Sequence, residues 1–113
     1  MQVDLEEPFY LFGGKTLLLK VYFDQCEADA FYSHVHTFQT WLRRNKTLPL
    51  YQREGHLHLT QFSQQLFQQK MEVKSIQSEE MTRKTLEEIQ LKIKDTQHLS
   101  QRGWLEEKVK GLI

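Results

Sequence analysis

Several features that would narrow the choice of function are scarce in this chain of 113 residues. Cys26 is the only cysteine, so no disulfide can form within one chain, and a reducing cytoplasm is the expected location. Lys plus Arg equals Asp plus Glu at 15 each, which argues against duplex DNA or an anionic membrane as the partner. No apolar run reaches the length of about 20 residues that a membrane-spanning helix needs. The first residues, MQVDLEEP, lack the basic-then-apolar order of a signal peptide.

The composition that remains is typical of a globular domain. Hydrophobic residues make up 39% of the chain and charged residues 27%. A chain of this length can bury a core without a disulfide or a metal. We therefore expect one domain spanning residues 1–113.

The stretch Thr16–Asp24, TLLLKVYFD, is rich in residues that favour strands. At period two, one face carries Leu17, Leu19, Val21 and Phe23, and the other carries Thr16, Leu18, Lys20 and Tyr22. Gly13-Gly14 precedes it and follows a short apolar run, which is the pattern of a hairpin turn. The prediction is a central strand paired with an edge strand over residues 8–12.

A helix is predicted over residues 26–44. Apolar residues recur at helical spacing, and Asp24 and Glu27 have the spacing of a capping box with Asp24 as N-cap. Arg43 and Arg44 lie in the last turn, where they complement the helix dipole. The apolar stripe consists of Phe31, Val35, Phe38 and Leu42.

The segment Leu48–Thr60 predicts a second hairpin, with Glu54-Gly55 as the turn. A helix over Gln61–Lys70 and a strand over Met71–Ile76 are expected to follow. Two further helices are expected, one over residues 79–95 and one that Ser100 caps.

From Thr16 to Ile76 the expected order is strand, helix, strand, strand, helix, strand. This order predicts an α+β fold, a ferredoxin-like βαββαβ antiparallel sheet with an added leading hairpin strand. Residues 1–7 would be a frayed terminus, 8–76 the α+β core, and 78–113 a C-terminal helical arm. The alternative is a winged helix with residues 48–60 as the wing.

No catalytic group can be assembled from the sequence. His56 and His58 would share one face of a strand, but two ligands do not make a zinc site. Gly13-Gly14 lacks the following helix that a dinucleotide-binding loop requires, and a hairpin turn explains it better. We expect no metal and no cofactor.

The outer face of the expected sheet is the candidate interaction surface. Three explanations for it are open: the contact surface of a homodimer, a platform for single-stranded nucleic acid, or a face covered by the C-terminal helices. The zero net charge counts against nucleic acid. The candidate residues are Lys20, Tyr22, Tyr51, Arg53, His56 and His58.

The C-terminal helix carries four large apolar side chains that need a covering surface: Trp104, Leu105, Val109 and Leu112. A second copy would provide one, so they are the candidate dimer interface. The function expected from these observations is a small cytoplasmic, non-enzymatic interaction or regulatory module that acts as a homodimer. The alternatives are a nucleic-acid-binding regulator and a small-molecule sensor or enzyme.

Overall fold

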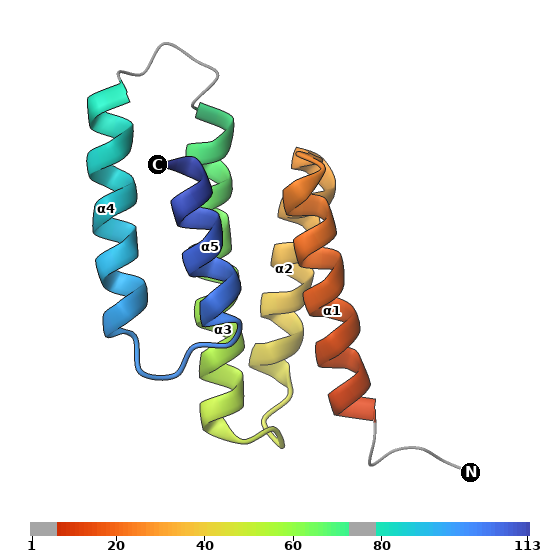
Figure 1. Cartoon of the computed structure of the whole chain (residues 1–113). Helices are drawn as coiled ribbons and strands as arrows, with labels where there is room; N and C mark the ends of the chain where they lie inside the picture. Colours follow the sequence, from red (N-terminus) through yellow and green to blue (C-terminus); the bar gives the residue numbers. More distant parts are fainter. Residues whose placement is uncertain (1–6, 73–78) are drawn as a thin grey trace. The chain divides into compact units, whose positions relative to one another are not determined.

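The computed structural model describes residues 7–72 and 79–113, with side chains from Phe12 onward, and these residues form five α-helices (Figure 1). The helices are α1 (Glu7–Asp24), α2 (Ala28–Arg44), α3 (Leu50–Glu72), α4 (Glu79–Asp95) and α5 (Arg102–Leu112). The chain divides into two compact units, Met1–Leu48 and Pro49–Ile113, and each is described by itself.

The predicted α+β class is wrong, because the described residues contain no strand. The ferredoxin-like sheet is therefore absent from this part of the chain, and so is the hairpin that a winged helix would need. The boundary between the two units, at Leu48 and Pro49, falls inside the expected α+β core.

The stretch predicted as the central strand forms the second half of α1. An apolar run that is apolar on all sides fits a buried strand and a buried helix equally well, so its pattern could not decide between them. Gly13 and Gly14 continue this helix, and among the described residues no glycine has a positive φ, so they make no hairpin turn.

The residues expected to form the capping box of the following helix instead end α1 in a Schellman motif. The amide of Glu27 donates to the carbonyl of Tyr22 at 3.2 Å, and the amide of Cys26 donates to that of Phe23 at 3.3 Å. Cys26 has a φ of 56°, the left-handed conformation that glycine usually supplies at this position. α2 then begins at Ala28 without a side-chain cap on its first turn, so Asp24 is not its N-cap.

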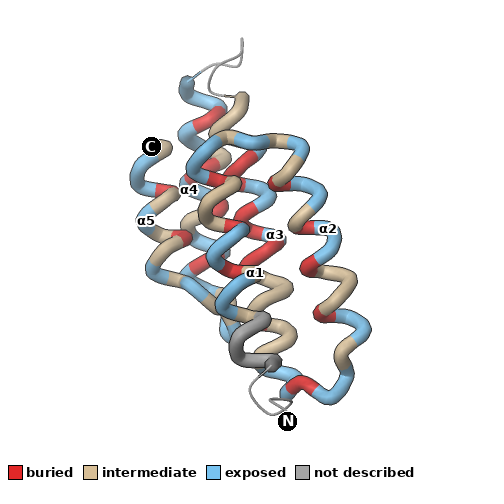
Figure 2. The backbone as a smooth tube through the Cα atoms, turned by 90° about the vertical axis from the view of Figure 1, so that its right-hand side faces the viewer, coloured by how far each residue is buried: buried red, intermediate tan, exposed pale blue. Residues whose placement is uncertain are grey.

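α1 and α2 form the first unit by packing side by side as a helical hairpin (Figure 1). The ring of Phe12 meets that of Trp41 at 5.5 Å between centroids, and the ring of Phe23 meets that of Phe31 at 6.0 Å. The predicted stripe of α2 is confirmed, since all four of its residues are buried and recur along the helix (Figure 2).

The predicted second hairpin is also wrong, because residues 50–60 lie within α3. Pro49, inside the segment predicted as a hairpin, opens the helix instead: its carbonyl accepts from the amides of Gln52 and Arg53, both at 3.1 Å. Met71 and Glu72 end α3 instead of beginning a strand, and the remainder of that predicted strand lies outside the described residues.

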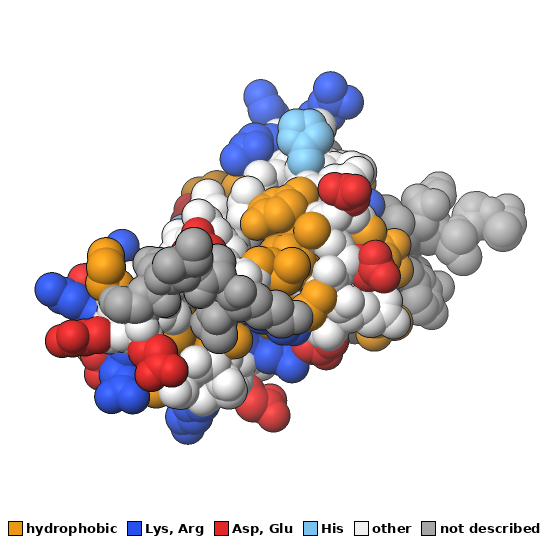
Figure 3. All heavy atoms as spheres, turned by 90° about the horizontal axis from the view of Figure 1, so that it is seen from above, with side chains coloured by type: hydrophobic (Ala, Val, Ile, Leu, Met, Phe, Trp, Pro, Cys, Tyr) orange, Lys and Arg blue, Asp and Glu red, His pale blue; other side chains and the backbone are white. Residues whose placement is uncertain are grey.

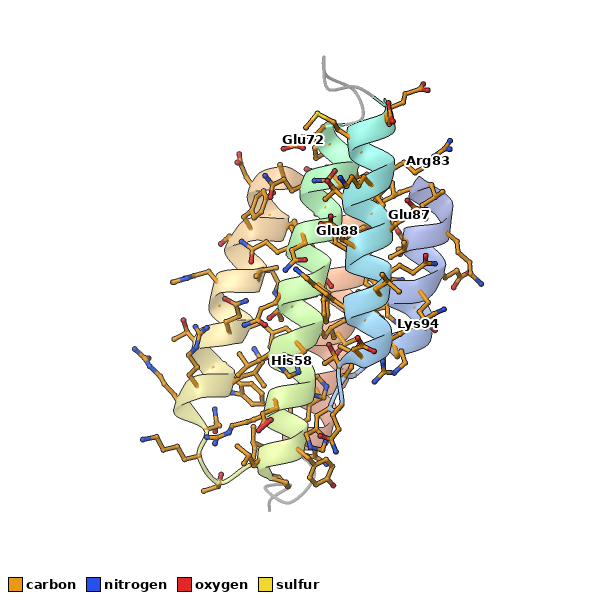
Figure 4. All side chains as sticks on the ribbon, turned by 90° about the vertical axis from the view of Figure 1, so that its left-hand side faces the viewer. His58, Glu72, Arg83, Glu87, Glu88 and Lys94 are labelled. Carbon is orange, nitrogen blue, oxygen red and sulfur yellow. The ribbon has the colours of Figure 1, made fainter. Side chains whose placement is uncertain are left out.

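In the second unit each of α3, α4 and α5 contacts the other two. The helix predicted over residues 79–95 is confirmed at both ends. On this helix Met81 is 61% exposed, whereas the polar Thr82 is buried. The exposed side of α4 is charged, with Arg83, Glu87 and Lys94 extending from it (Figure 4).

Arg102 connects the start of α5 to the end of α4. Its guanidinium donates to the carbonyls of Ile93, Lys94 and Thr96. These carbonyls have no amide partner further along their own helix, and the positive charge also suits the negative end of the helix dipole. The α4–α5 connection is thereby held as a structured loop.

Candidate functional site

The six residues predicted to share one sheet face lie on two different helices. Lys20 and Tyr22 lie on α1 in the first unit. The other four lie on α3 in the second unit, where Figure 4 shows His58. No sheet joins the two sets in the described residues, so the nucleic-acid platform expected there loses its basis.

In the second unit, the α4–α5 loop rests directly on Gly55 of α3. The amide of Ser100 donates to the carbonyl of Gly55 at 3.1 Å. A Cβ built on Gly55 would lie 3.4 Å from the amide nitrogen of Ser100 and 3.7 Å from the carbonyl carbon of His98. Gly55 is therefore a site of close backbone approach, and the predicted turn at this glycine is wrong.

His56 holds the same loop with its side chain. Its Nδ1 lies 2.9 Å from the carbonyl oxygen of Gln52, which can only accept, so Nδ1 carries the proton. Its Nε2 lies 3.3 Å from Oγ of Ser100 and accepts from that hydroxyl. Burial lowers the pKa of His56, and the hydrogen bond to Gln52 partly offsets this effect. The imidazole is thus neutral at pH 7.

His58 approaches the loop from the other side of Gly55. His56 and His58 are two residues apart, so their side chains are separated by about 200° around the helix axis. They therefore lie on either side of Gly55 instead of sharing a strand face. Nδ1 of His58 donates to the carbonyl of His98 at 2.7 Å. The ring of Tyr51 lies 6.4 Å from that of His98.

A shallow cavity of about 270 Å³ lies between the first turns of α3 and the loop, and it is lined by Tyr51, Gly55, His56, His98 and Ser100 among others, but not by His58. A serine hydroxyl beside a neutral imidazole is an arrangement used for nucleophilic chemistry. The amide of Ser100 could stabilise an oxyanion formed in such chemistry, but here it already donates its hydrogen bond to the carbonyl of Gly55. The contacts account for an anchor that fixes the loop on α3.

Among the described residues, no group of three or more His, Cys, Asp or Glu side chains could hold a metal ion. His34 and His36 diverge on α2, and His34 Nε2 donates to the carbonyl of Lys15 at 2.7 Å. Cys26 occupies the turn between α1 and α2 and is partly exposed.

The four candidate dimer residues fall into two pairs. Leu105 and Val109 are fully buried in the second unit, where α5 packs on α3 and α4. Trp104 and Leu112 are partly exposed, and Nζ of Lys108 lies 5.8 Å from the centre of the Trp104 ring. α3 and α4 together provide the covering surface that α4 alone could not.

α1 carries an apolar surface that the predicted strand did not indicate. Its covered face carries Phe12, Thr16, Leu19 and Phe23, of which Phe12 and Phe23 contact rings of α2. The opposite side, about 180° away at about 100° per residue, carries a second set with helical i, i+3, i+4, i+7 spacing. We call this set the outer face of α1; its members are Gly14, Leu17, Leu18 and Val21.

The outer face of α1 is open to solvent. Leu17 is 62% exposed and Leu18 44% exposed, while Val21 is partly exposed. A Cβ built on Gly14 would meet nothing within 4 Å. Exposed hydrophobic side chains also show at the surface in Figure 3. The helical spacing of Leu17, Leu18 and Val21 in the sequence is the signal that could have predicted this face.

Within residues 7–72 and 79–113, no helix combines the length and the apolar character needed to cross a bilayer. Comparisons of the chain with protein-family models, with curated proteins and with solved structures found no match.

Proposed function

We propose that this chain is a non-enzymatic, helical protein-interaction module that self-associates, and that the outer face of α1 is its contact surface. The observation that supports the proposal is that α1 has two opposite apolar faces while only one of them packs on α2. An apolar stripe on a helix normally faces a packing partner. The second face is thus built for burial.

The energy gained by covering this face is substantial. Full burial of a leucine side chain is worth roughly 1.5–3 kcal/mol. Leu17 and Leu18 are each about half exposed or more, and each would gain part of that amount. Apolar residues at contact positions with no charge among them are typical of the centre of a protein interface.

A cytoplasmic location and a non-catalytic role are part of the same proposal. A single cysteine supports a reducing compartment, so the proposed location is the cytoplasm. The proposal of a non-catalytic role rests on the Ser100–His56 pair, whose hydrogen bonds are accounted for by the loop anchor.

Sedimentation equilibrium over a range of about 1–100 μM tests the proposal, because dissociation constants in that range correspond to about 5.5–8 kcal/mol of association energy. The test variant is Leu17→Glu, which places a charge in the outer face. The matched control is Leu91→Glu on α4, since Leu91 is 63% exposed and Leu17 62%.

We expect the wild type and Leu91→Glu to form dimers, and Leu17→Glu to stay monomeric. A monomeric wild type at the highest concentration would contradict self-association. Loss of the dimer in Leu112→Glu but not in Leu17→Glu would place the interface on α5 instead.

A further inference from the structure

We draw no further inference here: the strongest candidate, the shallow cavity between the first turns of α3 and the α4–α5 loop that His56 and Ser100 line, belongs to the site already described, where the hydrogen bonds of these two residues anchor the loop.

Discussion

Gly55 offers the sharpest test of how the second unit is held together. Replacing it with alanine removes the helix-weakening effect of glycine, worth about 0.8–1.0 kcal/mol. The new methyl group would lie 3.4 Å from the amide nitrogen of Ser100, which is close but tolerable contact. Gly55→Ala should therefore change the free energy of unfolding by less than about 1 kcal/mol, towards greater stability.

Gly55→Leu should have the opposite effect. A larger side chain must push the α4–α5 loop away from α3, which breaks the hydrogen bond from the amide of Ser100 to Gly55 and the one between Ser100 and His56. Overpacking of this kind costs about 1–3 kcal/mol, more than the helix gains. After the helix gain of about 0.8–1.0 kcal/mol is subtracted, we expect a net loss of up to about 2 kcal/mol.

Urea unfolding followed by far-ultraviolet circular dichroism measures both changes. Gly103→Leu serves as the control, because a Cβ on Gly103 meets nothing within 4 Å and the residue lies in the same unit. If Gly55→Leu were as stable as Gly103→Leu, the loop would not rest on Gly55, and the account of this contact would be wrong.

Three further changes have defined outcomes in the same unfolding assay. Phe38→Ala should cost about 3–5 kcal/mol, because Phe38 is fully buried; a loss below about 1 kcal/mol would place it outside the core. Burial lowers the pKa of His56 below 6.5, so stability should be full above that pH and should fall as the pH drops from 6.5 towards the lower folded value. His56→Gln should flatten that fall, and an unchanged slope would show that another group causes it. Arg102→Met should cost about 1–3 kcal/mol by removing charged hydrogen bonds to the end of α4, whereas the exposed Arg83→Met should cost little; equal losses would count against the cap.

The helices that could be predicted are those with one apolar face. α2 and α4 each alternate apolar and polar residues at helical spacing, so their type and most of their bounds follow from the sequence. α1 has no such contrast, since Leu17 and Leu18 are as apolar as the buried Leu19. Its helical state depends on length and packing, which local pattern does not report.

The helix predicted over Gln61–Lys70 lies within α3, but the first half of α3 was missed, for a different reason. Proline and glycine inside the segment 48–60 are compatible with a hairpin, yet Pro49 opens a helix and Gly55 permits close backbone contact. The close backbone contact at Gly55 depends on Ser100, which lies 45 positions later in the chain. His56 and His58 therefore stand out in the sequence, but they flank Gly55 on a helix instead of sharing a strand face.

The α4–α5 loop has a consequence for how the protein opens. Ser100 and His98 bond to α3, and Arg102 bonds to the end of α4. Separating any one of these helices from the unit breaks hydrogen bonds to another helix, so α3, α4 and α5 should unfold together. In native-state hydrogen exchange their slowest amides should share one opening free energy, as a single cooperative unit does. α1 and α2 belong to the other compact unit, and their amides should exchange with a free energy of their own.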